Sequence, residues 1–150
     1  MALEKNQIKK IAENKKAYFQ YHVIDRWEAG IVLIGDEVKA IRHGNINFKD
    51  SYVIFEKDES WLHGFHISYT KSYGTAYPDK KRKLLLHKSE IRKISSKAQE
   101  KGLTIIPLSI YFKNNHVKLE IGSAKGKTLF DKRKTIKEKD INRNLRNDVW

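Results

Sequence analysis

The last 26 residues of the chain, 125–150, constrain its fold most, because they cannot supply a hydrophobic core. Nine of them are lysine or arginine and four are aspartate or glutamate, with few apolar side chains between the charges. Such a segment buries too little apolar surface to offset the entropy lost on ordering, so we expect it to be disordered when free and to order on contact with a polyanion. We therefore assign residues 1–122 to a folded body and 123–150 to a basic C-terminal tail.

The charge of the whole chain indicates the kind of partner it binds. Lysine and arginine total 31 against 18 acidic residues, which gives a formal net charge of +13. Because so basic a protein attracts phosphate-rich polymers, nucleic acid is the first candidate partner and an anionic membrane surface is the second.

Membrane and secretory classes fit the sequence poorly. The longest apolar stretch, around residues 105–112, is far shorter than the roughly 20 residues that a spanning helix needs. The start of the chain, MALEKNQIKK, lacks the apolar region of a signal peptide. With no cysteine, neither a disulfide framework nor a thiolate metal site is expected. We expect a cytoplasmic protein that makes no membrane contact.

Apolar and β-branched residues alternate with period two through much of the body, which is typical of half-buried strands. The predicted strands are residues 17–34 with a bend at 28–30, then 51–55, 61–67, 104–112 and 116–121. Asn114 and Asn115 lie between the last two, so we expect a hairpin there. Residues 68–81, which include a glycine and a proline, are predicted to be an irregular loop.

Helix signals are fewer. The predicted helices are 37–43, between an N-cap at Asp36 and a stop at Gly44, and 86–101, stopped by Gly102. A weaker helical pattern spans 7–13. The order of elements predicts a mainly β fold with short helices (α+β): an antiparallel OB-like closed barrel with two to three helices and a flexible basic C-terminal tail. Small barrels of this kind often bind oligonucleotides.

Two basic clusters are candidate phosphate contacts. Residues 80–83 read Lys-Lys-Arg-Lys, so Arg82 and Lys83 are predicted RNA-binding residues of a phosphate clamp, the alternative being a solvated loop. Lys125 and Lys127 flank Gly126 where the body ends; there the alternative is a flexible exit from the barrel. Neither the P-loop pattern nor GxGxxG is present.

The sequence contains no recognisable catalytic or metal-binding pattern. His63 and His66 fall on opposite faces of a predicted strand, and neither HExxH nor a GxSxG elbow occurs. We therefore expect no enzyme activity, no catalytic residue, no metal and no cofactor. A nuclease or RNA-modifying enzyme that uses a histidine or Glu28 is the alternative.

Exposed aromatic side chains near cations are candidates for stacking on bases. Those in predicted non-core segments are Tyr69, Tyr73, Tyr77 and Phe130. Most of the other aromatics, such as Trp61 and Phe65, are expected to lie in the core.

The tail can form a helix on contact with a partner. Its apolar residues form a loose stripe, and Thr135 with Glu138 resembles a capping box. Lys134 and Glu138 are spaced for an i,i+4 ion pair. These small contributions permit a helix without enforcing one in free solution.

Five motifs, in order along residues 14–140, resemble the SmpB family, the SsrA-binding proteins of bacterial trans-translation. They are EAGIVLIGDEVKAIRHG (28–44), DSYV (50–53), RKLLLHKSEI (82–91), PLSIYFKN (107–114) and KGKTLFDKRKTIKEKD (125–140). The resemblance implies an OB-like barrel with a C-terminal tail. It also implies a tmRNA-binding adaptor that delivers the tRNA-like domain of tmRNA to the A site of stalled ribosomes (ribosome rescue).

The resemblance also implies site residues. Those for the tRNA-like domain are Asn14, Glu28, Leu85, Lys118, Lys125 and Lys127. Those of the tail, which would sense the empty mRNA channel beside the decoding centre of the stalled ribosome, are Phe130, Asp131, Lys132, Arg133, Lys134, Ile136 and Lys137. Departures from the family pattern are Thr128, where a further basic residue is common, and the end NDVW, which is less basic than in many relatives. We expect a monomer. The alternative function is a ribosomal or ribosome-assembly RNA-binding protein.

Overall fold

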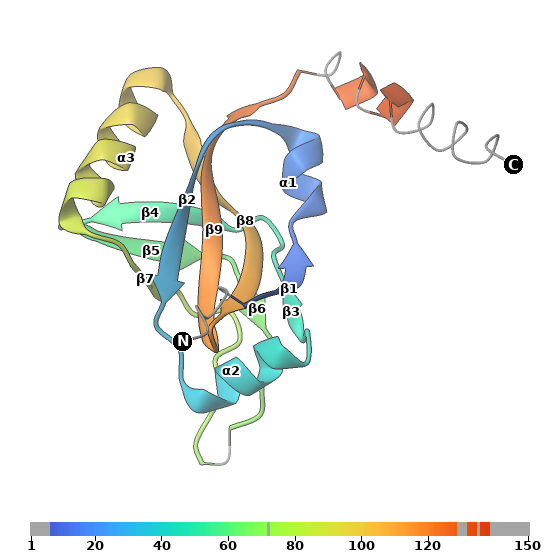
Figure 1. Ribbon diagram of the computed structural model, residues 1–150, viewed down its shortest axis with the longest axis vertical. Helices are drawn as coiled ribbons and strands as arrows, with labels where there is room; N and C mark the ends of the chain where they lie inside the picture. Colours follow the sequence, from blue (N-terminus) through green and yellow to red (C-terminus); the bar gives the residue numbers. More distant parts are fainter. Residues whose placement is uncertain (1–6, 72, 129–131, 135, 139–150) are drawn as a thin grey trace, which may run out of the picture.

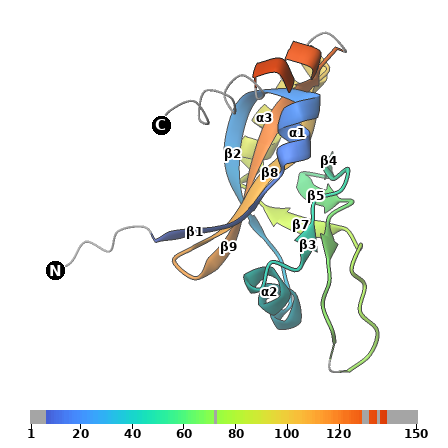
Figure 2. The same cartoon turned by 90° about the vertical axis from the view of Figure 1, so that its right-hand side faces the viewer.

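A computed structural model describes residues 7–71, 73–128, 132–134 and 136–138 of the chain (Figures 1 and 2). The helices are α1 (Lys15–Gln20), α2 (Gly35–Arg42) and α3 (Lys88–Lys101). The strands are β1 (Ile8–Glu13), β2 (Tyr21–Ile31), β3 (Ile46–Asn47), β4 (Tyr52–Glu56), β5 (Glu59–His63), β6 (His66–Ile67), β7 (Arg82–Leu85), β8 (Thr104–Lys113) and β9 (His116–Gly126). None of the helices in these ranges is long and apolar enough to cross a bilayer.

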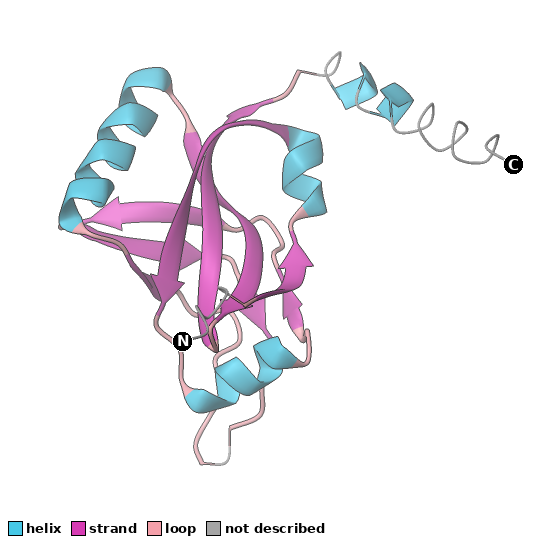
Figure 3. Ribbon diagram, in the orientation of Figure 1, coloured by secondary structure: helices cyan, strands magenta, loops and turns pink. Residues whose placement is uncertain are grey.

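The strands form one large antiparallel sheet and one small one (Figure 3). The order in the large sheet is β1-β8-β9-β2-β7-β5-β4, and β3 pairs with β6 in the small sheet. In Figure 1, β4, β5 and β7 run steeply across β2, β9 and β8, so the sheet is strongly coiled. The fold is therefore mainly antiparallel β with short helices. Among the described residues the predicted closed barrel is not found: β1 and β4 are edges, and β4 contacts β8 without a ladder between them.

Two tight turns join neighbouring strands. Asn114 and Asn115 have φ of 50° and 68°, and Lys113 lies opposite His116 in the ladder. Positive φ at both central residues is the type I′ turn that suits the twist of a hairpin, so the predicted Asn turn is confirmed. Lys57 and Asp58 make the same turn between β4 and β5, with φ of 48° and 61°.

The segment before β2 differs from the prediction in both of its elements. Residues 7–13 were expected to be helical, but Ile8–Glu13 is a strand because it pairs with β8. The start of the predicted strand 17–34 is instead helix α1. Asn14 caps it: its side-chain oxygen accepts the Ala17 N–H at 3.2 Å. Local alternation suggested a strand here, and capping with packing on β8 overrode it.

The other two helices match their predictions within a few residues. α2 starts at Gly35, and Glu37 accepts the Ile34 N–H at 3.1 Å, as the third residue of a helix often does. α3 ends at Gly102, whose φ of 62° is the left-handed stop that the sequence predicted. The bend expected at 28–30 is not at that place; the ladder shifts register between Val23 and Asp25.

Strand pairing extends the body beyond the boundary drawn from composition. β9 runs to Gly126, which lies opposite Tyr21 of β2, so residues 123–126 belong to the sheet. β7 was not predicted, because its four residues begin inside the basic cluster 80–83. Both strands owe their extent to long-range partners, which a local pattern does not show.

The main core fills the inside of the coiled sheet. Its fully buried members include Ile41, Leu62, Phe65, Ile110 and Leu119. A second, smaller cluster of Ala17, Ile106, Leu108 and Ala124 lies under α1. α1 therefore adds a second apolar layer over one end of β8 and β9.

The described tail residues are helical. Residues 132–134 and 136–138 have helical structure, and the Lys132 N–H donates to the Thr128 carbonyl at 3.0 Å. Figure 1 draws them beyond the end of β9, away from the sheet. This part of the tail is thus helical, which is the conformation that we expected it to adopt on contact with a polyanion. Phe130, Asp131 and Thr135 lie outside the described residues.

The close packing in the smaller cluster generates a stability prediction. A Cβ on Gly122 would lie 2.7 Å from Leu108 Cδ1 and 3.1 Å from the Asp25 carbonyl oxygen. We expect Gly122→Ala to lower the free energy of unfolding by about 1–3 kcal/mol, because overpacking forces neighbours to move. Gly126→Ala is the matched control in the same strand, since a Cβ there meets nothing within 4 Å. Equal losses in urea unfolding would contradict this account.

Candidate nucleic-acid interface

Three of the residues implied for RNA contact, Glu28, Leu85 and Lys118, meet on the outer face of the large sheet, the face opposite the main core. Across four neighbouring strands the ladder aligns Tyr111, Lys118, Gly30 and Leu85 in one row. Directly opposed residues share a face. We call this line the outer row; Glu28 lies beside it, two residues before Gly30 on the same side of β2.

Leu85 lies exposed over Gly30. Its side chain is 56% exposed. A Cβ on Gly30 would lie 3.1 Å from Leu85 Cβ, so only glycine lets the two strands approach this closely without displacement. An exposed leucine beside bare backbone is a small apolar platform on which a base or ribose can pack.

Glu28 is held as an anion. Tyr111 Oη donates to its carboxylate at 2.5 Å, and Lys113 Nζ donates at 3.4 Å. The hydrogen bond from Tyr111 is the largest cause that lowers the pKa of Glu28; burial opposes it, and the Lys113 and Lys118 charges add to the lowering. Burial, followed by the Glu28 carboxylate, raises the pKa of Tyr111 above its ordinary value. Glu28 can therefore accept a hydrogen bond from a base or orient a neighbouring lysine.

A second polar group continues the same face. Arg26 Nη1 donates to Tyr18 Oη at 2.8 Å and to Glu120 at 3.1 Å, and its guanidinium lies 5.4 Å from the Tyr18 ring centroid. Tyr18, Arg26, Tyr111 and Glu120 line a cavity of about 290 Å³. The combination offers a cation, hydroxyls and aromatic faces to one ligand.

Trp61 and two lysines extend the face at the β7 side. Trp61 lies opposite Lys83 in the ladder, and its neighbours Ser60 and Leu62 are buried, so the indole is on the outer face. Lys81 Nζ lies 4.5 Å from the Trp61 ring centroid. The prediction that Trp61 belongs to the core is therefore wrong. Lys83 is half-exposed and pairs with Glu59 at 3.3 Å, an exposed ion pair that a phosphate can displace.

Arg82 is buried, so its side chain is not on the surface where the predicted RNA contact would need it. Its side chain is 1% exposed, and Nε donates to Glu37 Oε2 at 2.6 Å. The remaining nitrogens donate to the carbonyls of Phe65, Pro78 and Lys80 at 2.9–3.0 Å. Because these N–H groups donate to acceptors inside the protein, Arg82 is a structural residue. The exposed charges of the basic cluster belong to its neighbours.

Asn14 also has an internal role. It is 6% exposed; besides capping α1, its amide nitrogen donates to the Pro107 carbonyl at 2.9 Å. Lys125 is exposed and lies opposite His22, at the far end of β2 from Gly30. Lys127 follows β9, and its N–H donates to the Gln20 carbonyl at 2.8 Å. The structure thus separates Lys125 and Lys127 from the outer row.

The described tail residues lie beyond this end of the sheet. Arg133, Lys134, Ile136 and Lys137 are exposed and Lys132 is half-buried. Ile136 is 47% exposed. A helix with exposed cations and an exposed isoleucine can bind a second polyanionic surface.

The histidines form no metal site in the described ranges, where no group of three potential ligands was found. His66 instead bridges polar neighbours: Nδ1 lies 2.8 Å from Asp79 and Nε2 2.8 Å from Ser68 Oγ. The His66 hydrogen bond is the largest cause that lowers the pKa of Asp79. Of the tyrosines predicted to be exposed, Tyr73 and Tyr77 are 88% and 60% exposed.

Sequence reasoning missed several members of the interface. Five residues of the outer face lie outside any charge run and were not selected from a motif for their chemistry. They are Tyr18, Arg26, Trp61, Tyr111 and Glu120. Strict alternation in β2 was the available signal: Arg26 and Glu28 share a parity opposite to that of Ala29 and Ile31. The contacts between strands could not be read from that parity.

Comparisons with known proteins show which family this chain is similar to. The family model for SmpB protein matches residues 11–149. An SsrA-binding protein of a Nitratiruptor species is 54% identical over 143 residues, covering 93% of this chain and 95% of that protein. An SsrA-binding protein of Syntrophobacter fumaroxidans is 51% identical over 137 residues, covering 90% and 85%. A solved structure described as "tmRNA-SmpB: a journey to the center of the bacterial ribosome" is similar, with TM-score 0.67 and 41% identity over 79% of this chain and 85% of that one.

The Tyr111–Glu28 hydrogen bond predicts a pH effect. Because the pKa of Glu28 is lowered by folding, its contribution to stability is present above the ordinary glutamate pKa, about 4.3, and is lost as the pH falls through the lowered value. Tyr111→Phe removes the hydrogen bond that lowers the pKa of Glu28 most, so this pKa should rise. Carboxyl ¹³C NMR titration measures it, with Tyr52→Phe as control; an unchanged Glu28 titration would refute the assignment.

The adjacent residues Arg82 and Lys83 should respond oppositely to loss of charge. Arg82→Gln leaves the buried Glu37 with only the longer ion pair to Lys80 at 3.5 Å, so we expect a loss of about 3–5 kcal/mol in the free energy of unfolding. Lys83→Gln should change stability by less than about 0.5 kcal/mol and weaken binding to a structured RNA several-fold. Denaturant unfolding and filter binding measure the two effects. A stable Arg82→Gln protein with reduced RNA affinity would restore the phosphate-clamp interpretation.

Proposed function

Because this chain belongs to the SmpB family, we propose that it is a tmRNA-binding adaptor of trans-translation. It binds the tRNA-like domain of tmRNA and brings it to the A site of stalled ribosomes. The names of its relatives, and a solved structure of tmRNA with SmpB in a ribosomal context, support these two partners. The alternative, a ribosomal or ribosome-assembly protein, is supported by no observation beyond basic composition.

The observation that carries the proposal is the outer row. Three residues that the family resemblance assigns to RNA contact, Glu28, Leu85 and Lys118, come from three strands far apart in sequence and converge on one exposed face. The carboxylate accepts a hydrogen bond, the lysine neutralises a phosphate and the leucine packs against an apolar ring or ribose face. This mixture suits a folded RNA whose shape is read together with its charge.

We assign the second contact to the tail. Lys125 and Lys127 lie at the end of β2 and β9, away from the outer row, and the described helical residues continue from there. The face would hold the tRNA-like domain while Lys132, Arg133, Lys134, Ile136 and Lys137, with Phe130 and Asp131, meet the decoding centre and the empty mRNA channel. Exposure of these cations supports the division, since they are available to a second polyanion.

The remaining parts of the proposal concern chemistry and setting. The protein acts by binding, with no catalytic residue and no cofactor; as a partner of the ribosome it works in the cytoplasm, as a monomer. The contact between β4 and β8 supports an OB-like barrel that is incompletely closed. OB-like surfaces of this kind bind nucleic acid on an exposed sheet face.

Truncation tests the division of labour. Deleting residues 131–150 should leave the affinity for a transcript of the tRNA-like domain within about two-fold, because the outer row is intact. It should abolish tagging of nascent chains on ribosomes stalled without mRNA in the A site. The reciprocal variant is the full chain with both Glu28→Gln and Lys118→Gln. It should lose affinity for the tRNA-like transcript although its tail is intact. Loss of both activities to the same extent in the truncated protein would refute two separate contacts.

A further inference from the structure

Incomplete closure of the sheet leaves a seam between β8 and β4. β1 pairs with β8 only from Ser109 onward, so the first half of β8 has β9 on one side and no hydrogen-bonded strand of the described chain on the other. β4, the opposite edge of the sheet, lies across from it. Helix α1 covers one end of this gap.

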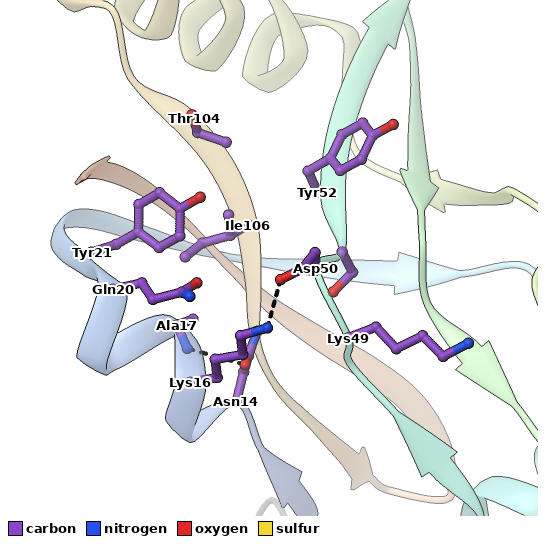
Figure 4. A pocket seen from close by; sticks show the side chains of 11 residues that line it. Asn14, Lys16, Ala17, Gln20, Tyr21, Lys49, Asp50, Tyr52, Thr104 and Ile106 are labelled. Carbon is purple, nitrogen blue, oxygen red and sulfur yellow. Dashed lines mark hydrogen bonds and ion pairs between the residues drawn. The ribbon is translucent and has the colours of Figure 1, made fainter. Parts of the chain in front are cut away.

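A pocket of about 130 Å³ occupies the seam, and we call it the seam pocket. It is lined by Asn14, Lys16, Ala17, Gln20, Tyr21, Lys49, Asp50, Ser51, Tyr52, Thr104 and Ile106. In Figure 4, Tyr21 and Tyr52 lie on opposite sides, with Thr104 and Ile106 of β8 between them. A shallower groove of about 600 Å³ runs on from it along Lys15, Lys49 and Asn47.

The pocket wall contains a buried hydroxyl without a partner. Ser51 is 5% exposed, and its Oγ has no hydrogen-bond partner among the described residues. Leaving a buried hydroxyl unpaired costs about 1–3 kcal/mol. Other buried polar groups of the described body, such as Ser60 Oγ on the Leu84 carbonyl, are paired. Because this oxygen is also closed to solvent, a bound molecule can supply the missing hydrogen bond only when the pocket wall shifts to expose it.

The rim of the seam pocket carries cations that an anion can recruit. Lys16 Nζ contacts Asp50 at 2.8 Å, and the two side chains are 54% and 83% exposed. An ion pair so exposed contributes about 0–1 kcal/mol, so a phosphate can take the place of the aspartate at little cost. Lys49 also lines the pocket, but its Nζ contacts Asp79 at 3.2 Å and its side chain points away from Lys16 in Figure 4. Lys15 lines the adjoining groove.

Aromatic rings complete the recognition chemistry. Tyr52 is 41% exposed and stacks on His63, with centroids 5.5 Å apart and planes 7° apart. This stacking fixes the ring orientation before any ligand arrives. A preorganised tyrosine at the mouth of a pocket, beside lysines, is the combination by which proteins hold unpaired nucleotides.

We propose that the seam pocket binds one unpaired nucleotide of an RNA, with its base against Tyr52, its phosphate at Lys16 and, once the pocket wall shifts, a polar group of the nucleotide hydrogen-bonded to Ser51 Oγ. The inference rests on the proposed RNA-binding function only for the class of partner. It concerns a different place from the outer row, which crosses β8, β9, β2 and β7 on the face away from the main core. One protein could then hold a structured RNA and a single-stranded nucleotide at once.

Titration of the ¹⁵N-labelled full chain with the single-stranded hexanucleotides U6 and A6 tests the proposal. Amide shifts should move at Ala17, Ser51 and Tyr52. Tyr52→Leu should weaken binding about ten-fold, as loss of one stacked base does, and Lys16→Gln about three-fold. The matched control is Lys101→Gln, an exposed lysine at the end of α3, which should leave the dissociation constant unchanged.

Ser51→Ala separates a ligand contact from a packing defect. If the hydroxyl serves the nucleotide, the variant binds the hexanucleotides about three-fold more weakly while its melting temperature stays equal or rises. If affinity is unchanged, or if the shifts appear only along the outer row, the seam pocket is not a nucleotide site. That result leaves the proposed function intact when the full chain still binds a tmRNA transcript, whereas loss of tmRNA binding in the wild-type chain would overturn the function itself.

Discussion

The buried ion pair between Glu37 and Arg82 is the interaction on which the arrangement of the RNA-facing surface depends. Both side chains are 1% exposed, so removal of Glu37 leaves the Arg82 charge buried without a carboxylate, and removal of Arg82 leaves Glu37 only the more distant Lys80 at 3.5 Å. Glu37 also accepts the N–H at the start of α2, and Arg82 donates to carbonyls at Phe65 and in the loop before β7. Helix, loop and strand are thereby tied together at one buried point.

The position of β7 follows from the ion pair between Glu37 and Arg82. With Arg82 pointing inward, period two turns its neighbour Lys83 outward, and Leu85 likewise, where it rests over Gly30. The outer row then continues across β2 and β9 to Lys118 and Tyr111. The same coiled sheet stops short of closing, which leaves the seam pocket between its edges. Both candidate RNA contacts are thus consequences of how one sheet coils around one core.

Local chemistry allowed good predictions only where neighbours in sequence decide the conformation. The stop at Gly102 and the turn at Asn114 and Asn115 were confirmed because each depends on backbone angles of the residues themselves. The segment before β2 was wrong in both of its elements, since a six-residue helix and a short edge strand take their stability from what they pack against. Within residues 80–83, composition alone could not distinguish the cation that is buried from those that are exposed.

From the sequence by itself came the basic charge, the antiparallel β character and, through motif order, the family, together with the predicted positions Glu28, Leu85 and Lys118. These are properties of composition, periodicity and motif order, which need no partner strand to be read. Only the tertiary structure decided that Arg82 is internal, that Tyr111 holds Glu28 as an anion and that the sheet remains open between β8 and β4. The physical reason is that each of these three features depends on the register between strands that are distant in sequence. Alternation along one strand shows which side chains face inward, but it does not show which residue of a neighbouring strand lies opposite.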